Sequence, residues 1–229
     1  LTALTICATI SNRAAAQGRQ DFSKVQETPP PLDPGLYMIV GAGGNTTLAV
    51  GTDALIVVDT QFAPVYPKLK AAIAAISTLP VKYVIDTHYH GDHTGGNANF
   101  AQDGATIVAQ ANVVRRLREP PPGPTGQAGQ PAPEQALPTR TYEERLTLSL
   151  RGRTAELTHL HNAHTDGDTV VYFPGANVVS TGDIVGSESY PNIDIVAGGS
   201  IDGLIKAVDV ILKMTNDQTE VVPGHGHLT

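Results

Sequence analysis

The stretch HYHGDH at residues 88–93 places three histidines and one aspartate within six positions, directly after the apolar run VKYVID at 81–86. That run is rich in β-branched and aromatic residues and predicts a buried strand. Four coordinating side chains so close together are costly to bury unless a cation compensates them. The end of this strand must therefore lie in a polar site, which we interpret as a metal site.

The spacing inside this cluster predicts two groups of ligands. His88 and His90 are two positions apart, so on an extended backbone both side chains leave on one face and can grip one ion. Asp92 and His93 follow in a turn that we expect Gly91 to permit, and they can point to a second ion. The cluster alone thus predicts a site for more than one metal.

The other histidines also follow or end strand-like runs. All eight histidines fall in three places along the chain, and Asp59 and Asp183 terminate two further apolar runs. In layered α/β folds, sites assemble at strand ends and in the loops after them. This distribution predicts a polynuclear metal site. Three histidines we interpret instead as surface or hydrogen-bonding residues: His159, His161 and His227.

Cysteine usage narrows the metal chemistry. The only cysteine is Cys7, which cannot form an internal disulfide or a thiolate zinc site by itself. Any metal must be held by imidazole and carboxylate, a ligand set that suits zinc first, with iron, manganese or cobalt also possible. A catalytic zinc keeps an open coordination position, so we expect three protein ligands and a water.

Hydrophobic periodicity predicts an α/β fold. Apolar runs bounded by turn residues predict strands, and apolar residues at i, i+4 and i+7 predict helices. The expected strands are 36–40, 46–50, 54–60, 81–86, 105–110, 145–150, 153–160, 169–174, 177–181 and 219–226. The expected helices are 66–77, 97–100, 112–119 and 200–215. Strands followed by a helix and a further strand occur twice, which favours two sheets packed face to face with helices outside.

The first 34 residues differ in composition from the rest. LTALTICATI is too short an apolar run to span a bilayer, and AAA at 14–16 resembles a signal-peptide cleavage site. We interpret residues 1–16 as the remnant of a signal peptide, which predicts a periplasmic or secreted protein. An ordinary amphipathic segment is the alternative. Residues 17–34 are expected to form a polar leader, and 35–229 a single domain.

Composition also limits the partners. The formal net charge is −7 and no basic block is present, which argues against a nucleic-acid partner. No segment is apolar enough to predict a membrane span, and the oligomeric state cannot be inferred. Residues 120–140 are rich in proline and glycine. A loop of that length is often a lid or a binding loop, and a solvated excursion without a role is the alternative.

Five motifs in order resemble those of the metallo-β-lactamase superfamily. HYHGDH is similar to its H-x-H-x-D-H signature, and four further motifs accompany it: VVDT (57–60), NAHTDGDTVVYFP (162–174), STGDIV (180–185) and VVPGHG (221–226). The resemblance covers about residues 36–227. It implies an αββα sandwich of two mixed sheets flanked by helices, with metals in a groove at one edge of the sheets.

The resemblance also implies a set of seven ligands. Three would hold a first metal: His88, His90 and His164. Three would hold a second metal: Asp92, His93 and His225. Asp183 would bridge both, and Asp59 falls where the family often has an aspartate that supports a ligand from behind. The expected cofactor is a pair of Zn²⁺ ions, with iron or manganese as alternatives.

The function implied by the resemblance is hydrolysis of a small-molecule carbonyl compound by a metal-activated water. Asp92 is the candidate catalytic residue, which would orient the water and relay its proton. β-Lactamases with a thiolate ligand have Cys in place of Asp183, Arg in place of His93 and Lys in place of Gly186. The ligand set therefore resembles that of glyoxalase II, lactonases and esterases. Our single expectation is a β-lactamase-like hydrolase acting on a β-lactam, lactone, ester or thioester.

Two other functions stay open at this point. A mononuclear iron site built from His88, His164 and Asp183 would resemble the persulfide dioxygenases, which are oxidoreductases of the same superfamily. A non-catalytic metal-binding module on an old hydrolase fold is the second alternative. The complete set of residues for a second metal counts against both.

Overall fold

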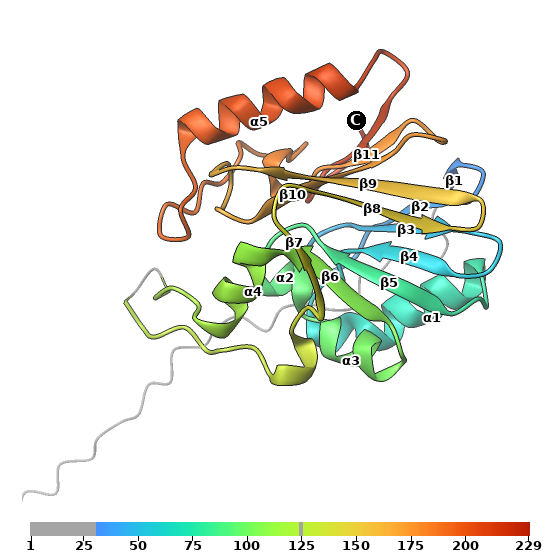
Figure 1. Ribbon diagram of the computed structural model, residues 1–229, viewed down its shortest axis with the longest axis horizontal. Coiled ribbons are helices and arrows are strands. Elements are labelled where there is room, and N and C mark those ends of the chain that lie inside the picture. The colour runs from blue at the N-terminus through green and yellow to red at the C-terminus, as the bar shows by residue number, and fades with distance from the viewer. Residues whose placement is uncertain (1–30, 124–125) are drawn as a thin grey trace, which may run out of the picture.

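Two mixed β-sheets pack face to face in the computed structural model, and helices cover both outer faces (Figure 1). The structure describes residues 31–123 and 126–229. This αββα arrangement confirms the predicted fold class. The interpretation of residues 1–16 as a signal peptide, and residues 17–30 of the expected leader, lie outside the described residues.

Within the described residues, the first sheet contains seven strands in sequence order. They are β1 (Pro31–Asp33), β2 (Leu36–Ile39), β3 (Thr46–Val50), β4 (Leu55–Val58), β5 (Val81–Asp86), β6 (Thr106–Gln110) and β7 (Arg140–Tyr142). The first four pair antiparallel, and β4 to β7 pair parallel. The sequence analysis did not predict β1 or β7. Each has only three residues, which is too short for hydrophobic periodicity to reveal.

The second sheet, in the part of the chain that the structure describes, contains five strands in the order β12-β11-β10-β9-β8. They are β8 (Arg145–Leu150), β9 (Arg153–Leu160), β10 (Asp168–Phe173), β11 (Val178–Ser180) and β12 (Glu220–Val222). Of these pairs, β11 and β12 run parallel and the others antiparallel. The expected strand 219–226 is shorter than predicted, so His225 lies in the turn that follows β12.

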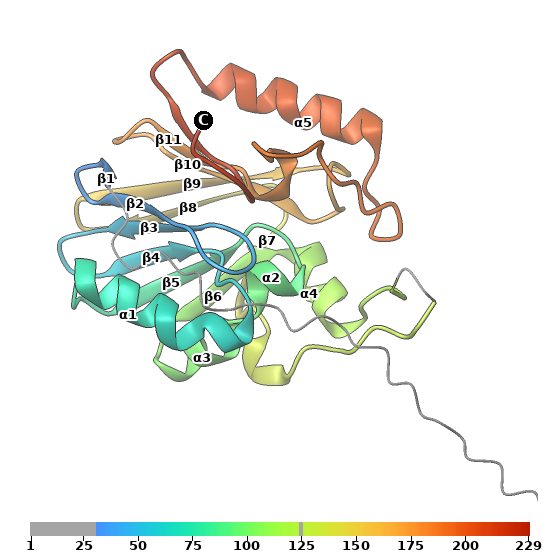
Figure 2. The ribbon, with the colours of Figure 1, turned by 180° about the vertical axis from the view of Figure 1, so that it is seen from behind.

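Helices lie on the outside of both sheets (Figures 1 and 2). The α-helices are α1 (Tyr66–Ile76), α2 (Gly91–Thr94), α3 (Asn97–Gln102), α4 (Ala111–Arg118) and α5 (Ile201–Met214), and the 3₁₀ turns are η1 (Ala63–Val65), η2 (Glu134–Ala136) and η3 (Gly182–Ile184). α5 covers the second sheet, and the other helices lie on the side of the first. Among the described residues, no helix combines the length and hydrophobicity that crossing a bilayer requires.

The main core lies between the sheets. Ile56, Val58 and Ile85 of the first sheet share one buried cluster with Leu157 and Phe173 of the second. β4 is buried on both faces, because its other side chains belong to the cluster under α1 and α3. Each such buried side chain contributes about 1.5–3 kcal/mol. The strand ends that carry the polar clusters are therefore fixed to a rigid frame.

Candidate metal centre

The seven expected ligands come together at one edge of the sandwich although they lie in four separate stretches of the sequence. His88 and His90 follow β5, and Asp92 and His93 lie in α2. The remaining three come from the β9–β10 loop, η3 and the turn after β12: His164, Asp183 and His225. They form two groups, and inside each group the candidate ligand atoms lie within 4.8 Å of one another.

The first group contains His88, His90, His164 and Asp183. Nδ1 of His90 lies 3.0 Å from Nε2 of His88 and 3.0 Å from Nε2 of His164. Oδ2 of Asp183 is 3.6 Å from Nε2 of His164 and 3.8 Å from Nε2 of His88. Two ligand atoms on a tetrahedral zinc with bonds of about 2.0–2.1 Å are roughly 3.3 Å apart. These separations fit such an ion.

The second group contains Asp92, His93 and His225, and it shares Asp183 with the first. Nε2 of His225 lies 3.3 Å from Nε2 of His93 and 3.3 Å from Oδ2 of Asp92. Oδ1 of Asp183 is 3.1 Å from Nε2 of His93 and 3.4 Å from Nε2 of His225. The two carboxylate oxygens of Asp183 therefore face one group each, the arrangement that a bridging ligand requires.

The outer ring nitrogens of the first group have hydrogen-bond acceptors, which settles the tautomers. Nδ1 of His88, Nδ1 of His164 and Nε2 of His90 each lie at 2.8–3.1 Å from an oxygen. Those oxygens are Thr87 Oγ1, Asn192 O and Asp194 Oδ2. Because each outer nitrogen donates its hydrogen, each inner nitrogen carries a lone pair. Three lone pairs at mutual contact repel one another unless a cation lies between them.

Burial and neighbouring charges shift the pKa values of the residues in both groups. Burial lowers the pKa of His88 and of His164, so both rings are neutral and ready to bind a metal at pH 7. Burial acts to raise the pKa of Asp183, but the neighbouring histidines outweigh it and hold that pKa well below its usual range. Hydrogen bonds to Asp183 and Asp92 raise the pKa of His225 to about 9. In the metal-free protein, His225 is therefore protonated at pH 7, and its positive charge lies where the second ion would bind.

The difference in protonation between the two groups predicts that the affinities for the two ions depend differently on pH. A metal in the second group must displace the proton from His225 (pKa about 9) and the one from His93, whose pKa Asp59 and Asp183 raise well above its usual range despite burial, so its apparent affinity should rise at least about tenfold per pH unit from pH 7 to 9. The first ion should respond less, since His88 and His164 are already neutral. Zinc titration against a competing chelator at pH 7–10 measures both affinities. Equal slopes for the two ions would contradict this assignment.

Asp59 supports the second group from behind. It is 2% exposed. Its Oδ2 accepts from Nδ1 of His93 at 2.8 Å, and its carboxylate also accepts from the backbone N and the hydroxyl of Thr87 at 2.8 Å each. Its φ is +62°, a left-handed conformation in which aspartate and asparagine are favoured over other side chains. The resemblance implied a supporting aspartate at this position.

Replacing Asp59 with asparagine should weaken binding of the second ion while the first is retained. Asparagine tolerates the left-handed backbone, but it removes the negative charge behind His93. Loss of an outer partner of a ligating histidine typically costs about 10–100-fold in metal affinity. Zinc titration of Asp59→Asn, with separate affinities fitted for the two ions, checks this. An unchanged second affinity would show that Asp59 has no such role.

Asp194 is a functional residue that the sequence analysis missed. It belongs to the irregular segment between η3 and α5, and its Oδ2 accepts from Nε2 of His90 at 3.0 Å and from the hydroxyl of Tyr89 at 2.6 Å. It thus supports His90 as Asp59 supports His93. No sequence motif or predicted strand end includes Asp194. It lies 104 positions from His90 along the chain, so their contact exists only in the folded protein.

Two glycines other than Gly91 are required by the site. A Cβ on Gly44 would lie 2.2 Å from the ring of His93, and one on Gly224 would lie 2.1 Å from Oδ1 of Asp183. The expectation that Gly91 permits the turn was wrong. Gly91 begins α2 without a positive φ, and a Cβ there would meet no atom within 4 Å.

An open groove of about 520 Å³ lies beside the first group. Its walls are Tyr89 and His90, the segment 121–123 from the proline-rich loop, and the segment 192–196. Ile195 and Val196 are 78% and 60% exposed. None of the described residues that line it is lysine or arginine. The first part of the proline-rich loop therefore forms a wall of this groove.

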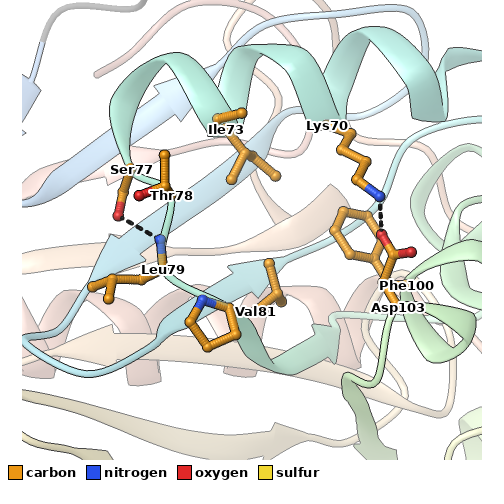
Figure 3. Close-up of a pocket in the computed structure, with 10 residues that line it drawn as sticks. Lys70, Ile73, Ser77, Thr78, Leu79, Val81, Phe100 and Asp103 are labelled. Carbon is orange, nitrogen blue, oxygen red and sulfur yellow. Dashed lines mark hydrogen bonds and ion pairs between the residues drawn. The ribbon is translucent and has the colours of Figure 1, made fainter.

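A second pocket, of about 310 Å³, lies between α1, the segment 77–81 and α3 (Figure 3). Most of its lining is apolar, and an ion pair between Lys70 and Asp103 lies at one side. It contains no residue of the two His/Asp groups. We therefore place the functional site at the metal-binding groups and the groove beside them.

Comparisons with known proteins agree with this geometry. The family model for the metallo-β-lactamase superfamily matches residues 39–227. This chain belongs to that superfamily. Solved metallo-β-lactamases share its fold: one from Pontibacter korlensis has a TM-score of 0.73 at 17% identity, covering 90% of this chain and 93% of that one. Metallo-β-lactamase IND-7 has a TM-score of 0.70 at 22% identity, covering 89% and 90%.

Relatives with assigned functions include more than β-lactamases. The chain is 35% identical over 146 residues to the 2,4-dinitroanisole O-demethylase subunit alpha of a Nocardioides species, covering 61% of this chain and 40% of that protein. It is 25% identical over 142 residues to the metallo-β-lactamase type 2 of Bacteroides fragilis, covering 62% and 52%. The chain thus spans about half or less of these two relatives. Membership in the superfamily, together with the His/Asp groups, indicates divalent metal binding.

Proposed function

We propose that the protein is a dinuclear zinc hydrolase that acts on the carbonyl group of a small ester, thioester, lactone or β-lactam. The observation that carries this proposal is the pair of ligand groups that share Asp183, with the inner nitrogens of three histidines converging on one point. Zinc is proposed because the ligand separations and the imidazole and carboxylate donors suit a tetrahedral ion. The proposed ligands are His88, His90, His164, Asp92, His93, His225 and Asp183.

Two zinc ions held by these residues would supply a Lewis acid and would lower the pKa of a bound water towards about 7. The protein's part is to hold and align the reactants. Burial acts to raise the pKa of Asp92, but the hydrogen bond from His225 and the charge of His93 together outweigh it and lower that pKa, so Asp92 is ionised. Its carboxylate lies at the edge of the second group and can orient a water and accept its proton. Asp194 and Asp59 keep His90 and His93 in fixed tautomers.

The groove beside His90 favours neutral substrates with an apolar group. Ile193, Ile195 and Val196 form one wall, and Pro121 and Pro122 form another. Because none of the described residues that line it is lysine or arginine, a substrate carboxylate would meet no positively charged side chain of that kind there. β-Lactam antibiotics that carry such a carboxylate stay candidates, but apolar esters and lactones fit the lining better. A periplasmic location would suit either class and stays a prediction.

A substrate panel on the zinc-loaded protein tests the proposal. It compares p-nitrophenyl esters, a homoserine lactone, S-lactoylglutathione, a chromogenic cephalosporin and a carbapenem. We expect the highest kcat/KM on an apolar neutral substrate, and we expect His88→Ala to abolish that rate. Persistence of the rate in His88→Ala would assign the activity to a contaminant or another site. No turnover of any substrate, with metals bound, would favour a non-catalytic module.

A second candidate is cleavage of an activated aryl ether. The observation that favours it is the 35% identity to a protein named as an O-demethylase subunit for 2,4-dinitroanisole, together with the apolar groove. The panel therefore also includes 2,4-dinitroanisole, and the release of 2,4-dinitrophenol from it is measured by absorbance. A mononuclear iron oxygenase is less favoured because the second group is complete. Metal analysis separates two zinc ions per chain from one iron.

A further inference from the structure

A third group of potential ligands lies outside the two already described. Glu144 follows β7, His159 lies near the end of β9, and His161 begins the β9–β10 loop. A ring nitrogen of each histidine and a carboxylate oxygen of Glu144 lie within 4.8 Å of one another. From the sequence, His159 and His161 were expected to be surface or hydrogen-bonding residues. We propose that Glu144, His159 and His161 form a separate site for a divalent transition metal such as Zn²⁺ or Cu²⁺.

The backbone presents the two histidines as a chelating pair. Positions 159 and 161 are two apart at the end of an extended strand, so their side chains leave on the same face. Their ring centroids are 4.1 Å apart. The backbone N of His159 donates to O of Glu144 at 2.9 Å, which fixes the start of β8 against β9. All three side chains are thus held at one corner of the second sheet.

His159 is prepared as a metal ligand. It is buried, and its Nε2 donates to the backbone O of Asp166 at 3.0 Å. A ligating histidine commonly donates its outer nitrogen to a carbonyl in this way, which leaves a lone pair on the other nitrogen. Burial also lowers the pKa of His159, so the ring is neutral at pH 7. The amide of Gln110 lies 3.4 Å from Nδ1, a long contact that an ion would replace.

The other two ligands are accessible to an ion from solvent. Nε2 of His161 lies 3.1 Å from Oε2 of Glu144. That separation is close to the roughly 3.3 Å expected between two ligands of one tetrahedral zinc. Their side chains are 61% and 68% exposed, so water can complete the coordination. With two imidazoles and one carboxylate, the donor set suits zinc or copper rather than magnesium or calcium.

An ion here would also stabilise the loop that carries part of the main centre. The β9–β10 loop begins with His161 and includes His164. Farther along, the carboxylate of Asp166 is already held by Arg115 and Arg116 of α4, at 2.6 and 2.8 Å. A metal that links Glu144 to His161 would fix the first end of the loop, as these ion pairs fix the other.

The test is a count of bound zinc ions, which does not depend on catalysis. The metal-free protein is dialysed against buffered Zn²⁺, and bound zinc is measured by mass spectrometry. The variants are His161→Ala and Glu144→Gln, whose exposed positions make unfolding a minor concern. His227→Ala is the matched control, because His227 is also exposed and pairs with Glu188 at 2.9 Å but has no third ligand in the described part of the chain.

We expect the wild-type protein and His227→Ala to bind one more zinc per chain than His161→Ala and Glu144→Gln. In both site variants the affinity for that ion should fall by more than about tenfold, since even an outer partner of a ligand is worth that much. A Cu²⁺ spectrum showing two nitrogen ligands that are lost in His161→Ala would support the same conclusion. An equal zinc count in all four proteins would overturn the proposal, as would an equal loss in His227→Ala. Neither result depends on how many ions the main centre holds.

Discussion

Replacing Asp183 with alanine should lower kcat/KM by roughly 10³-fold or more and remove at least one zinc from the main centre. Among the described residues, Asp183 is the one carboxylate that faces both groups, with Oδ2 towards His88 and His164 and Oδ1 towards His93 and His225. The Lewis acidity of one metal contributes several kcal/mol to a hydrolytic transition state, and each 1.36 kcal/mol is about a factor of ten in rate. Metal analysis and steady-state kinetics on the best substrate of the panel measure both effects.

The control for this variant is Asp209→Ala. Asp209 is an exposed aspartate in the middle of α5, away from both ligand groups, so the control removes the same charge without touching the site. It should keep its metals and its rate. If Asp183→Ala also retains both zinc ions and most of the activity, the shared-ligand assignment fails, whatever the fate of the other six residues.

Removal of the metals should lower the melting temperature by on the order of 10 °C. Without a cation, the converging nitrogens of the first group repel one another, and the buried Oδ1 of Asp183 keeps, among the described residues, only its contacts with His93 and His225, at 3.1 and 3.4 Å. A ligand present at about 1,000 times its Kd stabilises the native state by about 4 kcal/mol. For a protein of this size, each kcal/mol shifts the melting temperature by about 2–4 °C.

Thermal unfolding followed by circular dichroism, before and after dialysis against a chelator, measures this shift. Readdition of Zn²⁺ should restore the original melting temperature. His88→Ala is the informative comparison, since a protein that has lost the first ion should lose less on chelation. If the melting temperature does not change, although metal analysis shows complete removal, the ions do not stabilise the fold.

Local patterns were enough to predict most of the elements. β3, β5, β8 and β9 have the predicted bounds, and α1 and α4 differ from prediction by one residue at the ends. These elements are long enough for periodicity to show which side chains are buried. β1 and β7 were missed because three residues cannot establish a period, and their pairing with β2 and β6 depends on contacts with the rest of the sheet.

The ligand types were also visible in the sequence, because metal-binding side chains at strand ends form short motifs. Of the supporting residues, Asp59 was expected from the resemblance, but Asp194 was not. Asp194 reaches His90 across 104 positions, from a segment without regular structure. The apolar groove likewise combines residues near 90, 121 and 195, and no local pattern indicates that these segments meet.

The sequence by itself determined the class of fold and the chemistry of the donor atoms, since both follow from periodicity and from residue type within a few positions. The tertiary structure alone decided which nitrogen of each histidine faces inward, that Asp194 lies behind His90, and that Glu144, His159 and His161 share one corner. The physical reason is that hydrogen-bond partners, burial and mutual distance are properties of the packed chain. They arise only when the two sheets close on each other and bring distant loops to one edge.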